Sequence, residues 1–134
     1  MATTLVDSNV LLDYLTEDAE WSDWSAAMLV RATDTGVLAI NQIIFGEASV
    51  RFETIEEVER AIPADYFVRA PLPWEAAFLA AKVFAKYRRR GGTKTAPLPD
   101  FFIGAHAAVA GMTLLTRDAR RYRLYFPKLR IIAP

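Results

Sequence analysis

The sequence predicts an α/β fold in which a parallel sheet of about five strands is flanked by helices. Short apolar stretches of strand length alternate along the chain with segments whose apolar residues recur at helical spacing. No linker rich in Pro, Gly or Ser and no internal repeat divides the 134 residues. The 53% hydrophobic and 24% charged residues are typical of a compact globule. We therefore expect residues 1–134 to fold as a single domain.

The predicted strands are short apolar runs that end at polar or turn-forming residues. The first two are expected at Thr4–Asp7 and Val37–Ile40. Phe67-Val68 fits either a third strand or an extended linker. Two more are expected later in the chain, at Thr113–Thr116 and, as an edge strand, at Arg130–Ile132. Because helical segments separate successive strands, the strands are expected to run parallel.

Helices are predicted where apolar residues recur every three or four positions between residues that favour helix ends. Pro73 and Pro99 each open a helix, Asn41 is expected to cap another, and Gly91-Gly92 to end a long one. The expected ranges are 9–15, about 22–32 with a stop at Gly36, 41 to about 52, 55–62, 73 to about 90, 99 to about 110, and one or two turns over 118–122.

The residue types that are scarce exclude several chemistries. The chain has no cysteine and one histidine, so disulfides, thiol nucleophiles and zinc sites of the Cys/His type are ruled out. A metal site would need oxygen ligands, which favours Mg²⁺, Mn²⁺ or Ca²⁺. His106 lies six residues after Asp100, on a different helix face, and is expected to be a packed or hydrogen-bonded residue, not a general base.

Nothing in the sequence indicates a membrane segment. No stretch approaches the ~18 uninterrupted apolar residues of a membrane span. The first ten residues also lack the basic start and the apolar stretch of a signal peptide. The expected compartment is the cytoplasm.

The net charge is zero, but acidic and basic residues are distributed unevenly along the chain. Residues 1–66 hold 3 of the basic and 13 of the acidic residues, whereas residues 67–134 hold 13 basic and 3 acidic residues. The two parts therefore carry −10 and +10. This asymmetry predicts a basic surface built by the later half.

Two acids follow predicted strands directly. Asp7 comes after Leu5-Val6, and Asp118 lies two residues beyond the strand at Thr113–Thr116. Ligands of parallel sheets bind beyond the carboxyl ends of the strands, so both carboxylates are candidates for a site there. Each residue alone could equally be a helix cap or a turn residue.

Two further acids lie where charge is unexpected. Glu47 has Ile43, Ile44, Val50 and Arg51 at helical spacings of three and four, which predicts a carboxylate within an apolar stripe or an ion pair with an arginine. Asp100 starts a helix that continues almost wholly apolar, so its beginning is expected deep in the fold, although acids also favour helix starts. Four such acids from four segments have a common use in a metal pocket made of oxygen ligands.

Several stretches now match a known family in order and spacing over essentially the full length. They are Val6–Asp13, Glu47, Pro99–Ala107 (PDFFIGAHA) and Leu114–Tyr122 (LLTRDARRY). The sequence resembles the PIN-domain ribonucleases, and in particular the VapC-type toxins of type II toxin–antitoxin systems. The resemblance implies an endoribonuclease that requires Mg²⁺ or Mn²⁺ and hydrolyses RNA phosphodiesters with a metal-activated water.

The resemblance also assigns roles to individual residues. Asp7, Glu47, Asp100 and Asp118 resemble the acidic quartet, with Asp7 and Asp100 as direct metal ligands, Asp118 completing the site or holding a second metal, and Glu47 binding metal or positioning the water. The hydroxyls expected beside them are those of Ser8 and Thr116.

Arginines near the acids are candidates for contacts with the RNA backbone. They are Arg88, Arg89, Arg90, Arg117, Arg120 and Arg121. The run at 88–90 fits a solvated helix end equally well.

The resemblance implies two protein partners. One is a second copy of the chain in a homodimer, and the other is a VapB-type antitoxin, a small protein that lies across the early helices. The acidic first 66 residues would suit a basic antitoxin segment. Trp21, Trp24 and Met28, like Trp74 and Phe78, fall at helical spacing; core packing is expected for both stripes, with a partner groove as the alternative.

Other function classes fit less well. A catalytically silent PIN-like module that binds protein or RNA would be signalled by loss of an acid, and all four are present. A phosphotransfer receiver needs a lysine after a late strand, where Arg117 stands. A phosphatase of the haloacid type needs an acid two residues beyond Asp7, where Asn9 stands.

Overall fold

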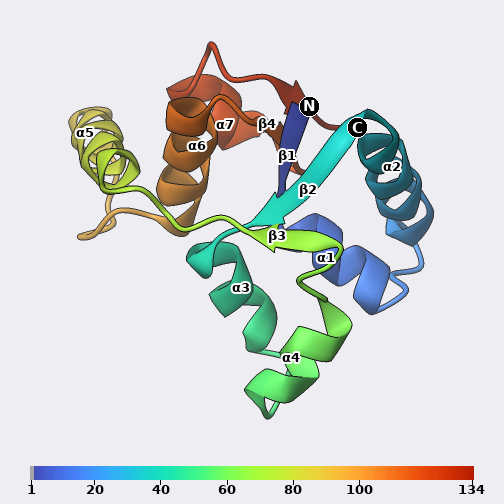
Figure 1. Cartoon of the computed structure of the whole chain (residues 1–134). Coiled ribbons are helices and arrows are strands. Elements are labelled where there is room, and N and C mark those ends of the chain that lie inside the picture. Colours follow the sequence, from blue (N-terminus) through green and yellow to red (C-terminus); the bar gives the residue numbers. More distant parts are fainter. Residues whose placement is uncertain (1) are drawn as a thin grey trace.

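The computed structural model describes residues 2–134 and contains a five-stranded sheet with helices around it (Figure 1). The strands are β1 (Ala2–Val6), β2 (Gly36–Ile40), β3 (Phe67–Arg69), β4 (Thr113–Leu115) and β5 (Ile131–Ile132). The helices are α1 (Ser8–Leu15), α2 (Ser22–Thr35), α3 (Gln42–Ser49), α4 (Ile55–Ala61), α5 (Trp74–Arg89), α6 (Pro99–Ala110) and α7 (Arg120–Tyr125).

The sheet is parallel throughout, as predicted, with the strand order β3-β2-β1-β4-β5. The short segment at Phe67 is a strand and not a linker, because it pairs with β2 from Leu38 to Ile40. β2 and β3 follow one another on one side of β1, and β4 and β5 lie on its other side. The point between β1 and β4 is therefore the switch point of the topology, where α/β proteins form crevices for ligands.

Helices cover both faces of the sheet, as expected for parallel strands. Figure 1 shows α2 on one side of the strands and α5, α6 and α7 on the other. The core between these layers is formed by fully buried strand residues and by the apolar α6, and it includes Leu5, Val6, Ile40, Phe101, Ile103 and Leu114. Because the core fixes the strands, it also fixes the positions of the residues that follow them.

Several helix boundaries differ from the sequence-based expectation: α2 continues to Thr35 and α7 to Tyr125, and two further differences affect the acids. α3 ends at Ser49 and not near Phe52, so Val50 is 84% exposed and leaves the apolar stripe that was expected to surround Glu47. The last helix begins at Arg120 and not at Asp118, because the carboxylate of Asp118 accepts from the amide of Arg120 and occupies the turn before the helix.

The expected burial of two aromatic residues on α5 is wrong. Trp74 is 90% exposed and Phe78 is 65% exposed. The helix buries Ala76, Ala80 and Val83 instead, and residues two positions away from these lie on the opposite face. In contrast, Trp24 and Met28 of α2 pack against the core while remaining half-buried.

His106 is a packed, hydrogen-bonded residue, as predicted. It is 2% exposed, and burial lowers the pKa of its imidazole. The Asn41 side chain caps α3 by accepting from the amide of Ile44, so its amide Nδ2 donates to Nδ1 of His106 at 3.0 Å. The predicted cap and the single histidine thus form one buried polar pair that joins α3 to α6.

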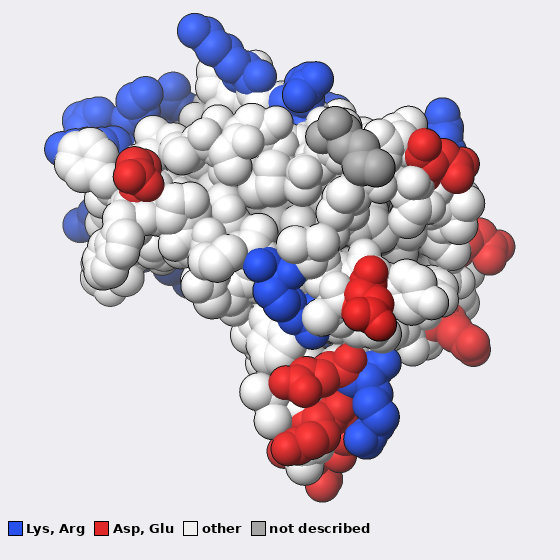
Figure 2. Space-filling view, in the orientation of Figure 1, with Lys and Arg blue, Asp and Glu red and all other residues white. Residues whose placement is uncertain are grey.

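Charge is divided over the surface as the two halves of the sequence predict. On the face shown in Figure 2, Lys and Arg gather over the end that holds α5 and α6, whereas Asp and Glu gather over α4 and the side that holds α2. None of the helices within residues 2–134 has the length and apolar composition needed to cross a bilayer.

Candidate functional site

Asp7 lies at the centre of the polar groups gathered at the switch point. It follows β1, and as the cap of α1 its Oδ1 accepts from the amide of Ser8 at 2.8 Å. Its Oδ2 accepts from the hydroxyls of Thr116, which follows β4, and of Tyr122 in α7, each at 2.9 Å. Asp7 is 5% exposed, and this burial raises the pKa of its carboxyl, with the nearby charge of Asp100 acting in the same direction.

Tyr122 links Asp7 to the second predicted acid, Asp100. Its hydroxyl is 2.9 Å from Oδ2 of Asp7 and 3.4 Å from Oδ1 of Asp100, and its side chain is 1% exposed. Burial, followed by the charges of Asp7 and Asp100, raises the pKa of the Tyr122 hydroxyl far above its usual range. The hydroxyl is therefore a permanent donor between two carboxylates.

Asp100 has a cationic partner on its outer side. Nη1 of Arg121 lies 3.2 Å from Oδ2 of Asp100, and both side chains are partly open to water. An exposed pair of this kind contributes little stability and can separate readily. Arg121 therefore partly neutralises the negative charge of Asp100 from the side that faces solvent.

Glu47, in α3, lies near Asp7 and Asp100. Its Oε1 accepts from the Ser8 hydroxyl of α1 at 3.0 Å. The Glu47 side chain is half-buried. Burial raises the pKa of Glu47, and the charges of Asp7 and Asp100 raise it further. The arginine partner considered for Glu47 is not found: within residues 2–134 the ion pairs involve Asp13 and Asp100.

Asp118 lies apart from the other three acids. It is exposed, its Oδ1 accepts from the amide of Arg120 at 3.3 Å, and its own amide donates to Oγ1 of Thr116 at 3.2 Å. It shares with Asp100 a cavity of about 360 Å³. The structure thus brings Asp7, Glu47 and Asp100 together, and it places Asp118 at the rim.

The sequence-based reasoning gave no role to Tyr122 or Asn9, which complete the polar network. Asn9 donates from Nδ2 to Oγ1 of Thr116 at 3.3 Å and accepts at Oδ1 from the amide of Arg117 at 3.1 Å. Both residues lie within stretches singled out for their acids. The available signal was a polar side chain two residues after Asp7 and another four residues after Asp118, on helices that follow strands at the carboxyl edge of the sheet.

The candidate RNA-binding arginines fall into two groups. Nε of Arg117 lies 2.9 Å from the buried Asp13, and its guanidinium lies over the ring of Trp21. Arg88 donates to the carbonyl of Lys94 at 2.9 Å. The others have more freedom: Arg90 lies over the ring of Tyr125, Arg121 pairs with Asp100, and Arg89 and Arg120 are exposed.

Comparison with known proteins identifies the fold. The PIN domain family profile matches residues 4–127. The chain belongs to the PIN-domain family. No curated protein sequence matched it.

Solved structures similar to this PIN domain include members of the VapBC family of toxin–antitoxin systems, at low sequence identity. VapBC2 from Rickettsia felis, solved on a promoter DNA fragment, has a TM-score of 0.71 at 14% identity, with 98% of each chain covered. VapBC-1 from nontypeable Haemophilus influenzae has a TM-score of 0.72 at 14% identity, covering 98% of this chain and 97% of that one. FitAcB from Neisseria gonorrhoeae has a TM-score of 0.68 at 19% identity, with 96% of each chain covered. These similarities establish a shared fold.

The donor set of the PIN domain suits a hard divalent cation such as Mg²⁺ or Mn²⁺. The side-chain atoms at the switch point that could bind a metal ion are oxygens, from the carboxylates, the hydroxyls and the Asn9 amide. Within the described residues 2–134, buried Asp7 accepts from neutral groups and forms no ion pair, so no cation there offsets the cost of burying its charge. As the acids stand, no three of them within residues 2–134 approach closely enough to surround an ion. The fit therefore rests on donor chemistry and on the uncompensated negative charge.

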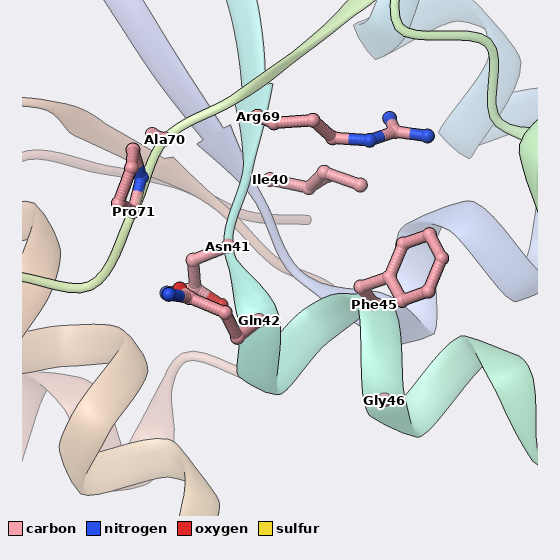
Figure 3. A pocket seen from close by; sticks show the side chains of 8 residues that line it. All are labelled: Ile40, Asn41, Gln42, Phe45, Gly46, Arg69, Ala70 and Pro71. Carbon is pink, nitrogen blue, oxygen red and sulfur yellow. The ribbon is translucent and has the colours of Figure 1, made fainter.

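A separate cavity of about 340 Å³ lies beyond the ends of β2 and β3, and Figure 3 shows the side chains that line it. Phe45 of α3 and Arg69 of β3 face each other there, with the guanidinium 5.4 Å from the ring centre. Arg69 donates to the carbonyls of Phe67 and Ile62, which fixes it in the structure. None of the four predicted acids lines this cavity.

Proposed function

We propose that this PIN domain is a divalent-metal-dependent endoribonuclease and the toxin of a toxin–antitoxin pair. The observation that carries the proposal is the convergence of Asp7, Glu47 and Asp100, linked by Ser8 and Tyr122, at the switch point of a parallel sheet. PIN domains are generally nucleases, and the neighbours with the same fold include members of the VapBC family of toxin–antitoxin systems. A phosphodiester is anionic, so a site made of carboxylates alone would repel it.

The proposed roles follow from the contacts of each residue. Asp7 and Asp100 would hold Mg²⁺ or Mn²⁺, with Tyr122 and Thr116 fixing the orientation of Asp7. When bound, the cation neutralises phosphate oxygens and lowers the pKa of the attacking water. Glu47, held by Ser8, would bind metal or position that water, and Asp118 would complete the site from the rim. Arg121 would leave Asp100 and contact a phosphate oxygen. Attack of water on phosphorus would break the bond to the 3′ oxygen, leaving a 5′-phosphate on one product and a 3′-hydroxyl on the other, as the resemblance to VapC-type toxins implies.

Cleavage of total RNA tests this function. The purified protein should produce new 5′ ends in Mg²⁺ or Mn²⁺, and a chelator should abolish them. Asp7→Asn and Asp100→Asn should lose cleavage, whereas Asp65→Asn, which changes an exposed acid beyond α4, should retain it. Full activity of both site variants, or cleavage in excess chelator, would reject the proposal. RNA binding without cleavage would instead favour the catalytically silent binding module.

A groove between α2 and α4 supports an antitoxin partner. It forms a cavity of about 480 Å³ whose walls include exposed apolar side chains: Tyr14 is 51% exposed, Val30 61% and Tyr66 72%. Tyr14 also lines an adjoining hollow that contains Glu17 and Asp23. The groove is lined mostly by apolar residues, with Arg60 at one wall, and it continues into the acidic hollow. This surface suits a partner segment carrying apolar and then basic side chains. We assign this groove to a VapB-type antitoxin.

Co-expression with the protein encoded beside it in its operon tests the groove. The native chain should purify with that partner and be inactive in the complex. Tyr66→Asp should release the partner, because a charge would replace an exposed apolar contact. If Tyr66→Asp retains the partner as firmly as the native chain does, the assignment to this groove is wrong.

Two further elements of the proposal concern assembly and RNA affinity. The resemblance to VapC-type toxins implies that two copies pair, so light scattering should give twice the mass of 15.0 kDa. Arginine contacts with the RNA backbone should make affinity fall steeply with added salt. A monomer in light scattering would remove the dimer, and a flat salt dependence would remove the backbone contacts.

A further inference from the structure

Some of the residues that line the cavity between Asp100 and Asp118 have no role in the proposed cleavage. Besides the two acids and the arginines of α7, it is lined by Tyr87 of α5 and by Leu124 and Tyr125 of α7. Its volume of about 360 Å³ lies within the range of about 300–1,000 Å³ that small-ligand sites occupy. The cavity thus adjoins the acidic group and offers an apolar, aromatic surface beside it.

The aromatic wall is held rigidly. Tyr87 stacks on Phe84 with ring centres 6.1 Å apart, and its hydroxyl accepts from the amides of Thr93 and Lys94 at 3.2 and 3.3 Å. Gly92 lies so close to the Tyr87 ring that a Cβ there would come within 2.2 Å of it. The Gly91-Gly92 turn therefore wraps around Tyr87, and the ring cannot move far.

Tyr125 is positioned in a similar way and has positive charge around it. Its ring and that of Phe101 pack edge to face with centres 5.2 Å apart, and the guanidinium of Arg90 lies 5.3 Å from the centre of the Tyr125 ring. Arg120 and Arg121 line the same cavity. Beside the rings, Leu124 leaves 56% of its surface exposed among these charged groups.

Aromatic faces, an exposed apolar side chain and surrounding arginines are the groups that bind an unpaired nucleobase together with its phosphates. We propose that this cavity, lined by Tyr87, Leu124 and Tyr125, holds the unpaired base of one nucleotide next to the cleaved bond. The inference rests on the proposed nuclease function. A base within a duplex is stacked and paired, so its faces are closed to the two tyrosines.

Binding of short labelled RNA to the full chain in chelator tests the site without cleavage. In fluorescence anisotropy, single-stranded RNA should bind more tightly than the same sequence in a duplex. Replacing one nucleotide at a time by an abasic one should weaken binding at least about fivefold at one position, since a stacked base contributes that much or more. Equal binding of every abasic RNA, or of the duplex, would overturn the proposal.

Two variants locate the base. Tyr125→Leu and Leu124→Glu should each weaken binding of the intact RNA and remove its advantage over the abasic RNA. Leu124→Glu changes an exposed side chain and should leave the melting temperature unchanged, which separates binding from folding. Trp74→Leu and Val50→Glu, at residues that are 90% and 84% exposed elsewhere, are the matched controls and should bind as the native chain does. If Leu124→Glu keeps full discrimination, the base does not occupy this cavity.

The two proposals can fail separately. If the native chain discriminates abasic RNA but cleaves no RNA in Mg²⁺ or Mn²⁺, the base site stands and the nuclease function is wrong. If it cleaves RNA but binds abasic and intact RNA equally, the nuclease function stands and the base site is wrong.

Discussion

The hydroxyl of Tyr122 donates to Oδ2 of Asp7 at 2.9 Å, in a position where neither group meets water freely. The contact joins residues 115 positions apart, one at the end of β1 and the other in α7. Because the same hydroxyl lies 3.4 Å from Asp100, it holds the two proposed metal ligands in one network. Tyr122 is therefore a positioning residue for Asp7.

Removing this hydroxyl should weaken both folding and cleavage. Tyr122→Phe keeps the ring and deprives a buried carboxylate of a donor, so we expect the free energy of unfolding to fall by about 1–3 kcal/mol. Urea unfolding of the metal-free protein measures this, and the rate of RNA cleavage should fall with it. Tyr66→Phe alters a tyrosine that is 72% exposed and should change stability by less than about 0.5 kcal/mol. Equal stability of the two variants would show that the hydrogen bond contributes nothing.

The raised pKa of Asp7 predicts how stability depends on pH. Burial favours the protonated carboxyl in the folded state, so the folded protein binds this proton more tightly than the unfolded chain does. The resulting stability is fully present below the ordinary value of 3.8 and is lost as pH rises through the higher pKa of the folded state. Glu47, whose pKa is raised from 4.5, acts in the same direction.

The comparison of native protein with Asp7→Asn isolates this effect. Without metal, Asp7→Asn should gain stability relative to the native chain as pH rises from about 4 to 7, because the amide carries no charge to bury. Saturating Mg²⁺ or Mn²⁺ should reduce that advantage, because the cation stabilises only the native carboxylate. The measurement is urea unfolding of both proteins at several pH values. A difference that is constant with pH would contradict the raised pKa.

A second buried carboxylate predicts a structural role for Arg117. Asp13 is 3% exposed, accepts from the Ser25 hydroxyl at 3.0 Å and has Nε of Arg117 at 2.9 Å. Arg117→Met would leave the charge of Asp13 without a cation. The free energy of unfolding in urea should therefore fall by about 1–3 kcal/mol. Arg31→Met, at an exposed position of α2, is the control and should be nearly neutral. If the two variants are equally stable, Arg117 has no structural role, and contact with RNA is the role left for it.

The extent to which the sequence predicted the site depends on the kind of residue. Asp7 and Thr116 follow strands, and the parallel order alone brings the ends of β1 and β4 together. Tyr122 was missed because its hydroxyl reaches Asp7 only when α7 packs against α6, and helix packing is not visible in local periodicity. Trp74 and Phe78 were wrongly expected in the core, because helical spacing shows that residues share a face without showing which face is buried.

The packing of α7 against α6 leads to a last prediction. A Cβ on Gly104 of α6 would come within 2.4 Å of the buried ring of Phe126, which directly follows α7. Gly104→Ala should therefore force the ring and α7 outward, lowering the free energy of unfolding by about 1–3 kcal/mol. Gly46→Ala in α3 is the matched control, because its Cβ meets nothing within 4 Å and alanine should raise stability by about 0.5–1 kcal/mol. Because α7 carries Tyr122, Gly104→Ala should also slow RNA cleavage. If Gly104→Ala instead raises stability as Gly46→Ala does, the close approach to Phe126 does not need glycine at this position.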